Sequence, residues 1–266
     1  MMSGHESEAM SMTADRFLAG RTALVTSSSR NLGASVVERL AVLGATVAVN
    51  YHQSGEVAAA LVAELRHRTG AEHVAIGGDV STGDSVRRLV DEATDRLGGR
   101  IDVLVNNSGP FSMQPFAELP ESEWDRIWDS NVRAAWLAIQ LVAPGMRAAG
   151  WGRIVNLSAG SAYLRNHSIY GLAKNAMIQL TEELAVELGP EITVNAVAPG
   201  QIAESAVDIE GFDPTFVSRA IAHTPAGRLV TRAEVAELIG LLCSPALAMV
   251  TGTAIPIDGG WRFNRF

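Results

Sequence analysis

The sequence predicts an α/β fold in which helices cover both faces of one doubly wound parallel sheet. Short runs rich in β-branched residues alternate with longer amphipathic runs along most of the chain. Such short apolar runs are typical of parallel strands that are buried on both faces. Regular alternation of strand and helix implies right-handed crossovers, which produce a parallel sheet. At 266 residues and 47% hydrophobic content, the chain can form one such domain with a large core.

The order of the expected elements follows from these runs. The apolar, β-branched runs predict strands at Thr22–Thr26, Thr46–Asn50, His73–Gly77, Ile101–Val105, Arg153–Leu157, Ile192–Val197 and Ala254–Ile257. The amphipathic runs predict helices at about Leu32–Leu43, Glu56–Thr69, Ser85–Leu97, Glu121–Met146 and Tyr170–Leu188. Ile202–Arg228 is the least regular long segment, and a final helix follows it. A sheet of this kind binds ligands beyond the carboxyl ends of its strands.

Composition argues against several classes of partner. The net charge is −8 and no basic stripe is present, so no nucleic-acid partner is expected. No apolar segment approaches the roughly 20 residues that span a bilayer, so no membrane partner is expected. Residues 1–16 are polar and unlike a signal peptide, which predicts a disordered N-terminal tail, a single domain over 17–266 and a cytoplasmic protein. Cys243 lies in an apolar run and is expected in the core, and no metal site is expected.

One pair of residues points to chemistry. Lys174 is the single lysine among 21 Lys and Arg residues, and it follows Tyr170 by four positions. Residues i and i+4 lie on one face of a helix, so the phenol and the ammonium can point into the same space. A nearby ammonium favours the phenolate and lowers the pKa of a tyrosine from its usual value near ~10. The pair predicts that Tyr170 is a general acid that protonates an oxygen on which negative charge develops.

The first expected strand ends in a turn that can bind phosphate. The turn, Thr26–Gly33, precedes a helix, and such a turn presents backbone N–H groups and a helix N-terminus to an anion. Further motifs follow in order: Asp79-Val80, Asn106-Asn-Ser-Gly109, Asn131, Tyr170-x-x-x-Lys174, Ile192-Thr-Val-Asn-Ala-Val-Ala-Pro-Gly200 and Thr251-Gly-Thr-Ala-Ile-Pro-Ile-Asp-Gly-Gly260. Over about 21–261, this series resembles the short-chain dehydrogenase/reductase family, whose members have a single-domain Rossmann-type fold.

The turn departs from the family pattern, Thr-Gly-x-x-x-Gly-x-Gly. Only Gly33 matches, while Ser27 and Asn31 stand where the first two glycines are expected. Asparagine tolerates the left-handed backbone region better than most residues, so Asn31 is expected to keep the turn. Ser27 is expected to narrow the phosphate cradle.

The resemblance implies roles for individual residues. Lys174 would hold the nicotinamide ribose and lower the pKa of Tyr170, and Tyr170 would protonate the substrate carbonyl as hydride arrives. Asn131 would anchor a water that relays protons to Lys174. The residues implied to bind the cofactor are Ser27, Ser29, Arg30, Asn31, Leu32, Asn50, Tyr51, His52, Asp79, Val80, Asn107, Ser108, Gly109, Tyr170, Lys174, Pro199, Gly200 and Ile202.

The end of the second expected strand indicates the cofactor. Enzymes that select NAD usually have an acid there to bind the ribose hydroxyls, but this chain has Tyr51 at that place. Arg30 matches the basic position that NADP-preferring relatives use for the 2′-phosphate. We therefore expect NADP(H).

The family also has a serine that hydrogen-bonds the substrate carbonyl, and Ala159 occupies its expected position. Ser158 and Ser161 flank this gap as possible substitutes. If the chain stays extended, Ser161 shares a face with Ala159 while Ser158 points away, which favours Ser161 as the catalytic residue.

The expected substrate is a small-molecule ketone or alcohol. The residues expected near it are Ser158, Ala159, Pro110, Phe111, Met113, Tyr163 and Leu164, with the segment at about 200–228 as a substrate loop. A 3-oxoacyl-carrier-protein reductase is the first alternative. Such relatives dock an acidic carrier through basic residues at places where this chain has Gly150 and Glu191, and the negative net charge also disfavours that partner.

Other readings remain open. The chain could be an enzyme of the same fold with non-redox activity, such as a cyclase or epimerase, or a catalytically silent binding protein. An enoyl reductase is disfavoured because those relatives space the tyrosine and lysine more widely. By resemblance, the long helices would pair with their copies in a homotetramer.

Overall fold

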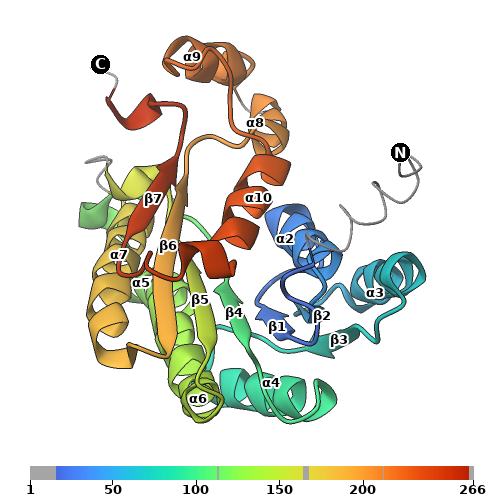
Figure 1. The fold of residues 1–266 in the computed structure, drawn as a ribbon. Helices are drawn as coiled ribbons and strands as arrows, with labels where there is room; N and C mark the ends of the chain where they lie inside the picture. The colour runs from blue at the N-terminus through green and yellow to red at the C-terminus, as the bar shows by residue number, and fades with distance from the viewer. Residues whose placement is uncertain (1–15, 113, 164–167, 212, 264–266) are drawn as a thin grey trace, which may run out of the picture.

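The computed structural model describes residues 16–112, 114–163, 168–211 and 213–263, so nearly all of the expected tail over 1–16 lies outside the described residues. The described residues form one seven-stranded sheet in the order β3-β2-β1-β4-β5-β6-β7 (Figure 1). Every pair of neighbouring strands is parallel. The predicted fold class is therefore confirmed.

The strands begin and end within three residues of the predicted positions. They are β1 (Thr22–Val25), β2 (Thr46–Tyr51), β3 (Val74–Gly77), β4 (Val103–Asn106), β5 (Gly152–Leu157), β6 (Ile192–Pro199) and β7 (Ala254–Ile257). The inner strands β1, β4, β5 and β6 are almost entirely buried, as their continuous apolar runs require. The strand order reverses between β1 and β4, which are hydrogen-bonded neighbours. A parallel sheet opens a crevice for ligands at such a point.

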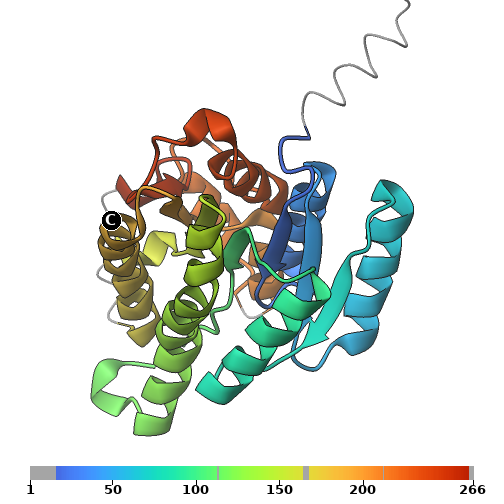
Figure 2. The ribbon, with the colours of Figure 1, turned by 60° about the horizontal axis from the view of Figure 1, so that its bottom comes forward.

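Helices cover both faces of the sheet (Figure 2). One face packs against α2 (Asn31–Val42), α3 (Gly55–Thr69) and α10 (Arg232–Leu242). The other packs against α4 (Gly83–Arg96), α6 (Ala134–Ala148) and the end of α7 (Ile169–Leu188). Cys243 is fully buried in the first core, as predicted.

The predicted helix over Glu121–Met146 is interrupted. It consists of α5 (Glu121–Trp128), a single π-helical turn η2 (Asp129–Arg133) and α6. A π turn widens the helix and changes where its side chains point, and such turns are frequent at functional sites. Asn131 lies in the middle of this turn.

The segment at about 200–228 is more regular than the sequence indicated. It contains α8 (Ala203–Glu210) and α9 (Phe216–Ala222). These two short helices surround a small core of their own, formed by Ala206, Ala220 and Leu229. The expectation of an irregular segment was wrong, because seven or eight residues give too few turns for a clear helical period.

Two properties concern the described residues only. No helix within the described ranges is long and apolar enough to cross a membrane. Likewise, the described part of the chain contains no group of three or more His, Cys, Asp or Glu side chains that could hold a metal ion.

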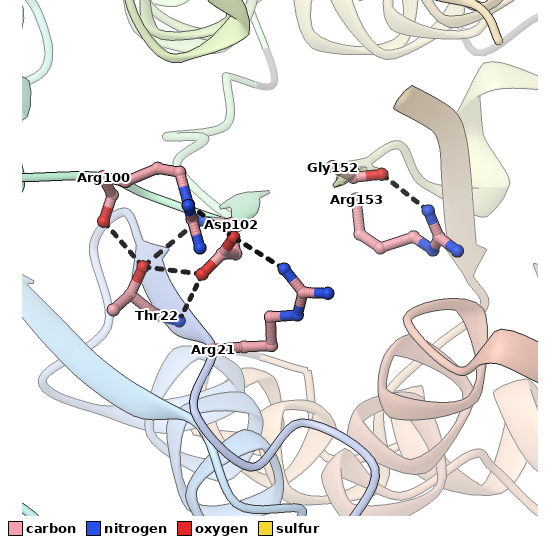
Figure 3. Close-up of polar contacts among 6 residues, drawn as sticks. All are labelled: Arg21, Thr22, Arg100, Asp102, Gly152 and Arg153. Carbon is pink, nitrogen blue, oxygen red and sulfur yellow. Dashed lines mark hydrogen bonds and ion pairs between the residues drawn. The ribbon is translucent and has the colours of Figure 1, made fainter. Parts of the chain in front are cut away.

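A buried carboxylate ties strands together at the amino edge of the sheet, opposite the ligand crevice (Figure 3). The side chain of Asp102 is 1% exposed and forms ion pairs with Arg21 at 3.2 Å and Arg100 at 2.8 Å. It also accepts a hydrogen bond from the backbone N–H of Thr22 at 3.0 Å. These contacts join the start of β1 to the residue that precedes β4.

We predict that Asp102→Asn destabilises the fold by about 2–4 kcal/mol, because it removes a buried charge that is hydrogen-bonded to two cations. Urea unfolding measures the effect. Glu64→Gln is the matched control, because its ion pair with Arg68 at 3.4 Å is exposed and is expected to contribute less than about 1 kcal/mol. Equal stability losses in the two variants would contradict the structural role of Asp102.

Candidate active site

A cleft of about 560 Å³ opens at the carboxyl ends of β1, β2 and β4. Ten of the residues predicted to bind the cofactor line this cleft. They are Ser27, Ser29, Arg30, Asn31, Leu32, Tyr51, His52, Asn107, Ser108 and Gly109, and Gly33, Gln53, Ser54 and Pro110 complete the lining.

The turn after β1 keeps a left-handed backbone at both positions where glycines were expected. Ser27 has φ 50° and Asn31 has φ 51°, so both residues adopt the backbone region that glycine enters most readily. Ser27 is held from both sides, since its N–H donates to Asn50 Oδ1 at 2.8 Å and its carbonyl accepts from Asn107 Nδ2 at 3.0 Å. These two contacts offset the strain that a left-handed serine introduces.

Gly33 is required for close packing rather than for its dihedral angles. A Cβ atom at this position would lie 2.6 Å from Ser28 Cα and 2.7 Å from Asn107 Nδ2. Any side chain would therefore push the turn away from the loop that follows β4. This explains why the chain retains the third glycine of the turn although it lacks the first two.

Asn50 does not line the cleft. It is 1% exposed, and its amide Nδ2 donates to the carbonyls of Gly78 at 3.1 Å and Ile76 at 3.3 Å. Asn50 therefore braces the turn and the end of β3 from behind. Thr26 has a similar role that sequence analysis missed, because its hydroxyl accepts from the N–H groups of Asn107 at 3.0 Å and Ser108 at 3.2 Å.

The described lining of the cleft contains an arginine and no carboxylate. Arg30 is exposed and has no ion-pair partner among the described residues. No aspartate or glutamate is present in the lining. Tyr51, at the expected place of an acid, lies with its ring 3.2 Å from where a Cβ of Gly55 would be. Within the described lining, no carboxylate competes with an anionic ligand for Arg30.

Besides Asn50, Tyr170 and Lys174, five of the predicted cofactor residues lie away from the cleft lining. Asp79 accepts two hydrogen bonds from Ser81, at 2.9 Å and 2.6 Å. Burial alone would raise the pKa of Asp79, but these hydrogen bonds lower it below its usual range. Val80 is 9% exposed and packs in the core beside α4. The others lie at the end of β6 or just before α8, namely Pro199, Gly200 and Ile202.

Three predicted catalytic and cofactor residues meet beside the cleft. A Cβ atom on Gly109 would lie 2.4 Å from Asn131 Oδ1 and 2.7 Å from Lys174 Nζ. The Nδ2 atom of Asn131 donates to the carbonyls of Ile127 at 2.9 Å and Pro110 at 3.1 Å, and its Oδ1 is buried without a hydrogen-bond partner in the described chain. The Oδ1 atom of Asn131 is thus available to accept a hydrogen bond close to the side-chain nitrogen of Lys174.

Tyr170 and Lys174 titrate differently from what the sequence suggested. Burial raises the pKa of Tyr170 to about 12 and lowers the pKa of Lys174 to about 7. The expected lowering of the Tyr170 pKa is not found here. Lys174 Nζ lies 5.6 Å from the centre of the Tyr170 ring and donates to the carbonyl of Leu157 at 2.9 Å. A neutral Tyr170 nevertheless carries the proton that a general acid needs.

The residues after β5 distinguish the two candidate serines. Gly160–Ala162 form a 3-10 turn, so the assumption of an extended chain after Ala159 was wrong. The hydroxyl of Ser158 donates to the carbonyl of Lys174 at 2.7 Å and is already satisfied. The hydroxyl of Ser161 is buried without a hydrogen-bond partner among the described residues. Of the two, Ser161 has the free hydroxyl.

The expected substrate residues lie on different loops. Phe111 and Tyr163 are 64% and 40% exposed, and they follow β4 and β5. Ala159 is partly buried at the start of the 3-10 turn. Met113 and Leu164 lie outside the described residues.

Comparison with known proteins gives matches along almost the whole chain. The matching family model is described as enoyl-(acyl carrier protein) reductase and covers residues 26–262. A tropinone reductase homolog of Arabidopsis thaliana is 36% identical over 255 residues, which cover 94% of this chain and 95% of the relative. A 3-oxoacyl-[acyl-carrier-protein] reductase of Staphylococcus epidermidis is 34% identical over 243 residues, covering 90% and 98%.

Solved structures share the fold as well as the sequence. The crystal structure of a gluconate 5-dehydrogenase from Burkholderia cenocepacia, in complex with NADP and tartrate, matches with a TM-score of 0.85 and 30% identity. The match covers 95% of this chain and 100% of the gluconate 5-dehydrogenase chain.

We predict that burial of Lys174 makes the unfolding free energy of the cofactor-free protein depend on pH. The folded pKa is about 7 against an ordinary 10.5, so the unfolded chain binds more protons between these values. The contribution of Lys174 to stability therefore rises as pH increases from 7 toward 9.5. Urea unfolding of the wild type and Lys174→Met over this range measures it, and a constant difference between the two proteins would contradict the buried, low-pKa lysine.

Proposed function

The chain belongs to the short-chain dehydrogenase/reductase family, and on this premise we propose that it is an NADPH-dependent reductase of a small-molecule ketone. Oxidation of the corresponding alcohol would use the same residues in reverse. The observation that carries the proposal is the meeting of Asn131 and Lys174 at Gly109, beside the cleft. Tyr170 lies on the same helix face as Lys174, one turn earlier.

The residues of the cleft fit a nicotinamide dinucleotide with a 2′-phosphate. Ser27, Asn31 and the N-terminus of α2 would face the diphosphate, because the turn offers backbone N–H groups at a helix N-terminus. Arg30 would pair with the 2′-phosphate, since no carboxylate in the described lining opposes it. The bound cofactor would supply a hydride.

The chain itself would manage the proton. Tyr170 would donate its phenolic proton to the ketone oxygen, and Ser161 would donate a hydrogen bond to the same oxygen. Lys174, once protonated, would stabilise the phenolate that remains, because an adjacent cation favours the charged form. Lys174 would then give a proton back to the phenolate, and a water that donates a hydrogen bond to the free Oδ1 of Asn131 would reprotonate Lys174.

The four-residue spacing of Tyr170 and Lys174 favours a ketone over the enoyl substrate named in the description of the family model. A carrier-bound 3-oxoacyl substrate is the alternative that the Staphylococcus relative suggests. The net charge of −8 and Glu191 before β6 disfavour it, because an acidic carrier would be repelled. We further propose that the protein is a cytoplasmic homotetramer, and sedimentation at micromolar concentration tests the assembly.

We predict that Arg30→Ala weakens NADPH binding roughly tenfold or more and leaves NADH binding almost unchanged. The reason is the loss of a charge-assisted contact to the 2′-phosphate, which NADH lacks. Titration of both cofactors, followed by quenching of the five tryptophans, measures the two affinities. Arg68→Ala, an exposed change on α3, is the control. Equal weakening of NADPH and NADH by Arg30→Ala would overturn the preference.

We predict that NADPH oxidation with a panel of ketones is lost in Tyr170→Phe, while NADPH binding remains.

Ser161→Ala should lower kcat on the order of 100-fold, because one donor to the developing oxyanion is gone. Ser158→Ala should lower the free energy of unfolding and leave kcat almost unchanged, because the Ser158 hydroxyl is hydrogen-bonded to the backbone carbonyl of Lys174. An acyl-carrier substrate in the panel tests the alternative. If the protein binds NADPH but reduces no ketone or thioester, a non-redox enzyme or a silent binding protein becomes the better reading.

A further inference from the structure

The loop after β4 is held by two side chains from the helix that contains the π turn. Asn131 Nδ2 donates to the carbonyl of Pro110 at 3.1 Å, and Arg126 Nη2 donates to the carbonyl of Phe111 at 3.3 Å. The first contact belongs to the proposed proton route. The second holds a residue that lies next to Tyr170 and has no part in the mechanism described above.

The ring of Phe111 packs against Tyr170. The two ring centroids are 6.4 Å apart and the planes meet at 75°, which is the favoured edge-to-face arrangement of aromatic pairs. Phe111 is also 64% exposed, so most of its remaining surface faces outward. An exposed aromatic ring in contact with the proposed general acid can contact the substrate of that acid.

Arg126 is itself fixed by its own helix. Its Nε and Nη2 atoms donate to the two carboxylate oxygens of Glu123 at 2.6 and 2.7 Å, which gives a bidentate pair. The hydrogen bond from Arg126 is the main cause that lowers the pKa of Glu123 to about 2, and a hydrogen bond from Ser112 lowers it further. Through Arg126 and Glu123, helix α5 therefore binds both Phe111 and Ser112. The pair stays charged throughout the neutral range.

We propose that Arg126 is a positioning residue that holds Phe111 against Tyr170, so that the Phe111 ring forms an apolar wall of the substrate site. The inference rests on the proposed function and adds a substrate class to it. A ketone with a flat hydrophobic group next to its carbonyl, such as an aryl ketone, stacks on this wall with its oxygen toward Tyr170. A small, fully hydroxylated ketone gains nothing from the wall.

Arg126 acts through Phe111 and not on the cofactor. It is absent from the lining of the cleft, and in the described chain its hydrogen bonds go to Glu123 and Phe111 and not to Tyr170 or Lys174. Its removal should therefore change kcat/KM for aryl ketones and leave the affinity for NADPH unaltered. A merely structural role would show in all substrates and in cofactor binding alike.

The test is a double-mutant cycle of Arg126→Gln and Phe111→Ala, measured as kcat/KM for an aryl ketone and for a small aliphatic ketone. Each single change should reduce the aryl activity roughly tenfold, because an aromatic contact of this geometry and a wall of the site are lost. In the Phe111→Ala background, Arg126→Gln should have no further effect. An additive loss in the double variant, or equal losses for both ketones, would overturn the proposal.

Arg68→Gln is the matched control. It removes an exposed ion pair on α3, to Glu64 at 3.4 Å, far from the loop that carries Phe111, and it should leave both activities unchanged.

A second measurement does not depend on activity. Hydrogen exchange at the amides of Phe111 and Ser112 should be faster in Arg126→Gln than in the wild type or Arg68→Gln. Unchanged exchange would refute the positioning role even if no reductase activity is found. Faster exchange in a protein that reduces no ketone would instead support the clamp and reject the proposed function.

Discussion

The close approach of three chain segments at Gly109 is the constraint on which the site depends. The loop after β4, the π turn and helix α7 converge there. A side chain at position 109 would clash with the side chains of Asn131 and Lys174, so only glycine fits. Each segment is anchored elsewhere by the sheet and its covering helices, so none can move away without disturbing buried packing. The positions of the ammonium and the free amide oxygen follow from this convergence. The cleft and the groups that we propose to move the proton are thereby held in one fixed arrangement.

Burial at this convergence explains the unusual titration of the two central groups. Desolvation raises the pKa of Tyr170 and lowers that of Lys174, so both are held toward their neutral forms. Charge is therefore scarce around Tyr170 and Lys174, whereas the adjacent cleft contains Arg30, which has no ion-pair partner within the described ranges. A negatively charged ligand that enters the cleft would favour the protonated form of Lys174, because it brings the opposite charge near. In the proposed mechanism, cofactor binding and the protonation of Lys174 are therefore linked electrostatically.

The two edges of the sheet have different tasks. At the amino edge, Asp102 is saturated with donors and fastens β1 to the residues before β4. At the carboxyl edge, hydroxyl and amide groups of Ser161 and Asn131 are buried with unused hydrogen-bonding capacity. An unsatisfied buried polar group costs stability. Unsatisfied polar groups at the carboxyl edge therefore lower the stability of the fold, whereas the ion pairs and hydrogen bonds of Asp102 at the amino edge raise it.

The sequence by itself determined most of the strand and helix order and the parallel sheet, because alternating hydrophobic periods are local properties. Ten residues of the cleft were indicated by the resemblance of ordered motifs to the family. Tertiary structure alone decided which candidates face the cleft. The Asn50 side chain is buried and hydrogen-bonds the backbone at the end of β3. The Ser158 hydroxyl donates to a backbone carbonyl of α7, whereas the Ser161 hydroxyl has no hydrogen-bond partner in the described chain. It also set the pKa values, since desolvation depends on every segment packed around a group. The hold of Arg126 on Phe111, 15 residues away, was likewise invisible in the sequence, because it is a contact between a loop and a helix that only the folded chain brings together.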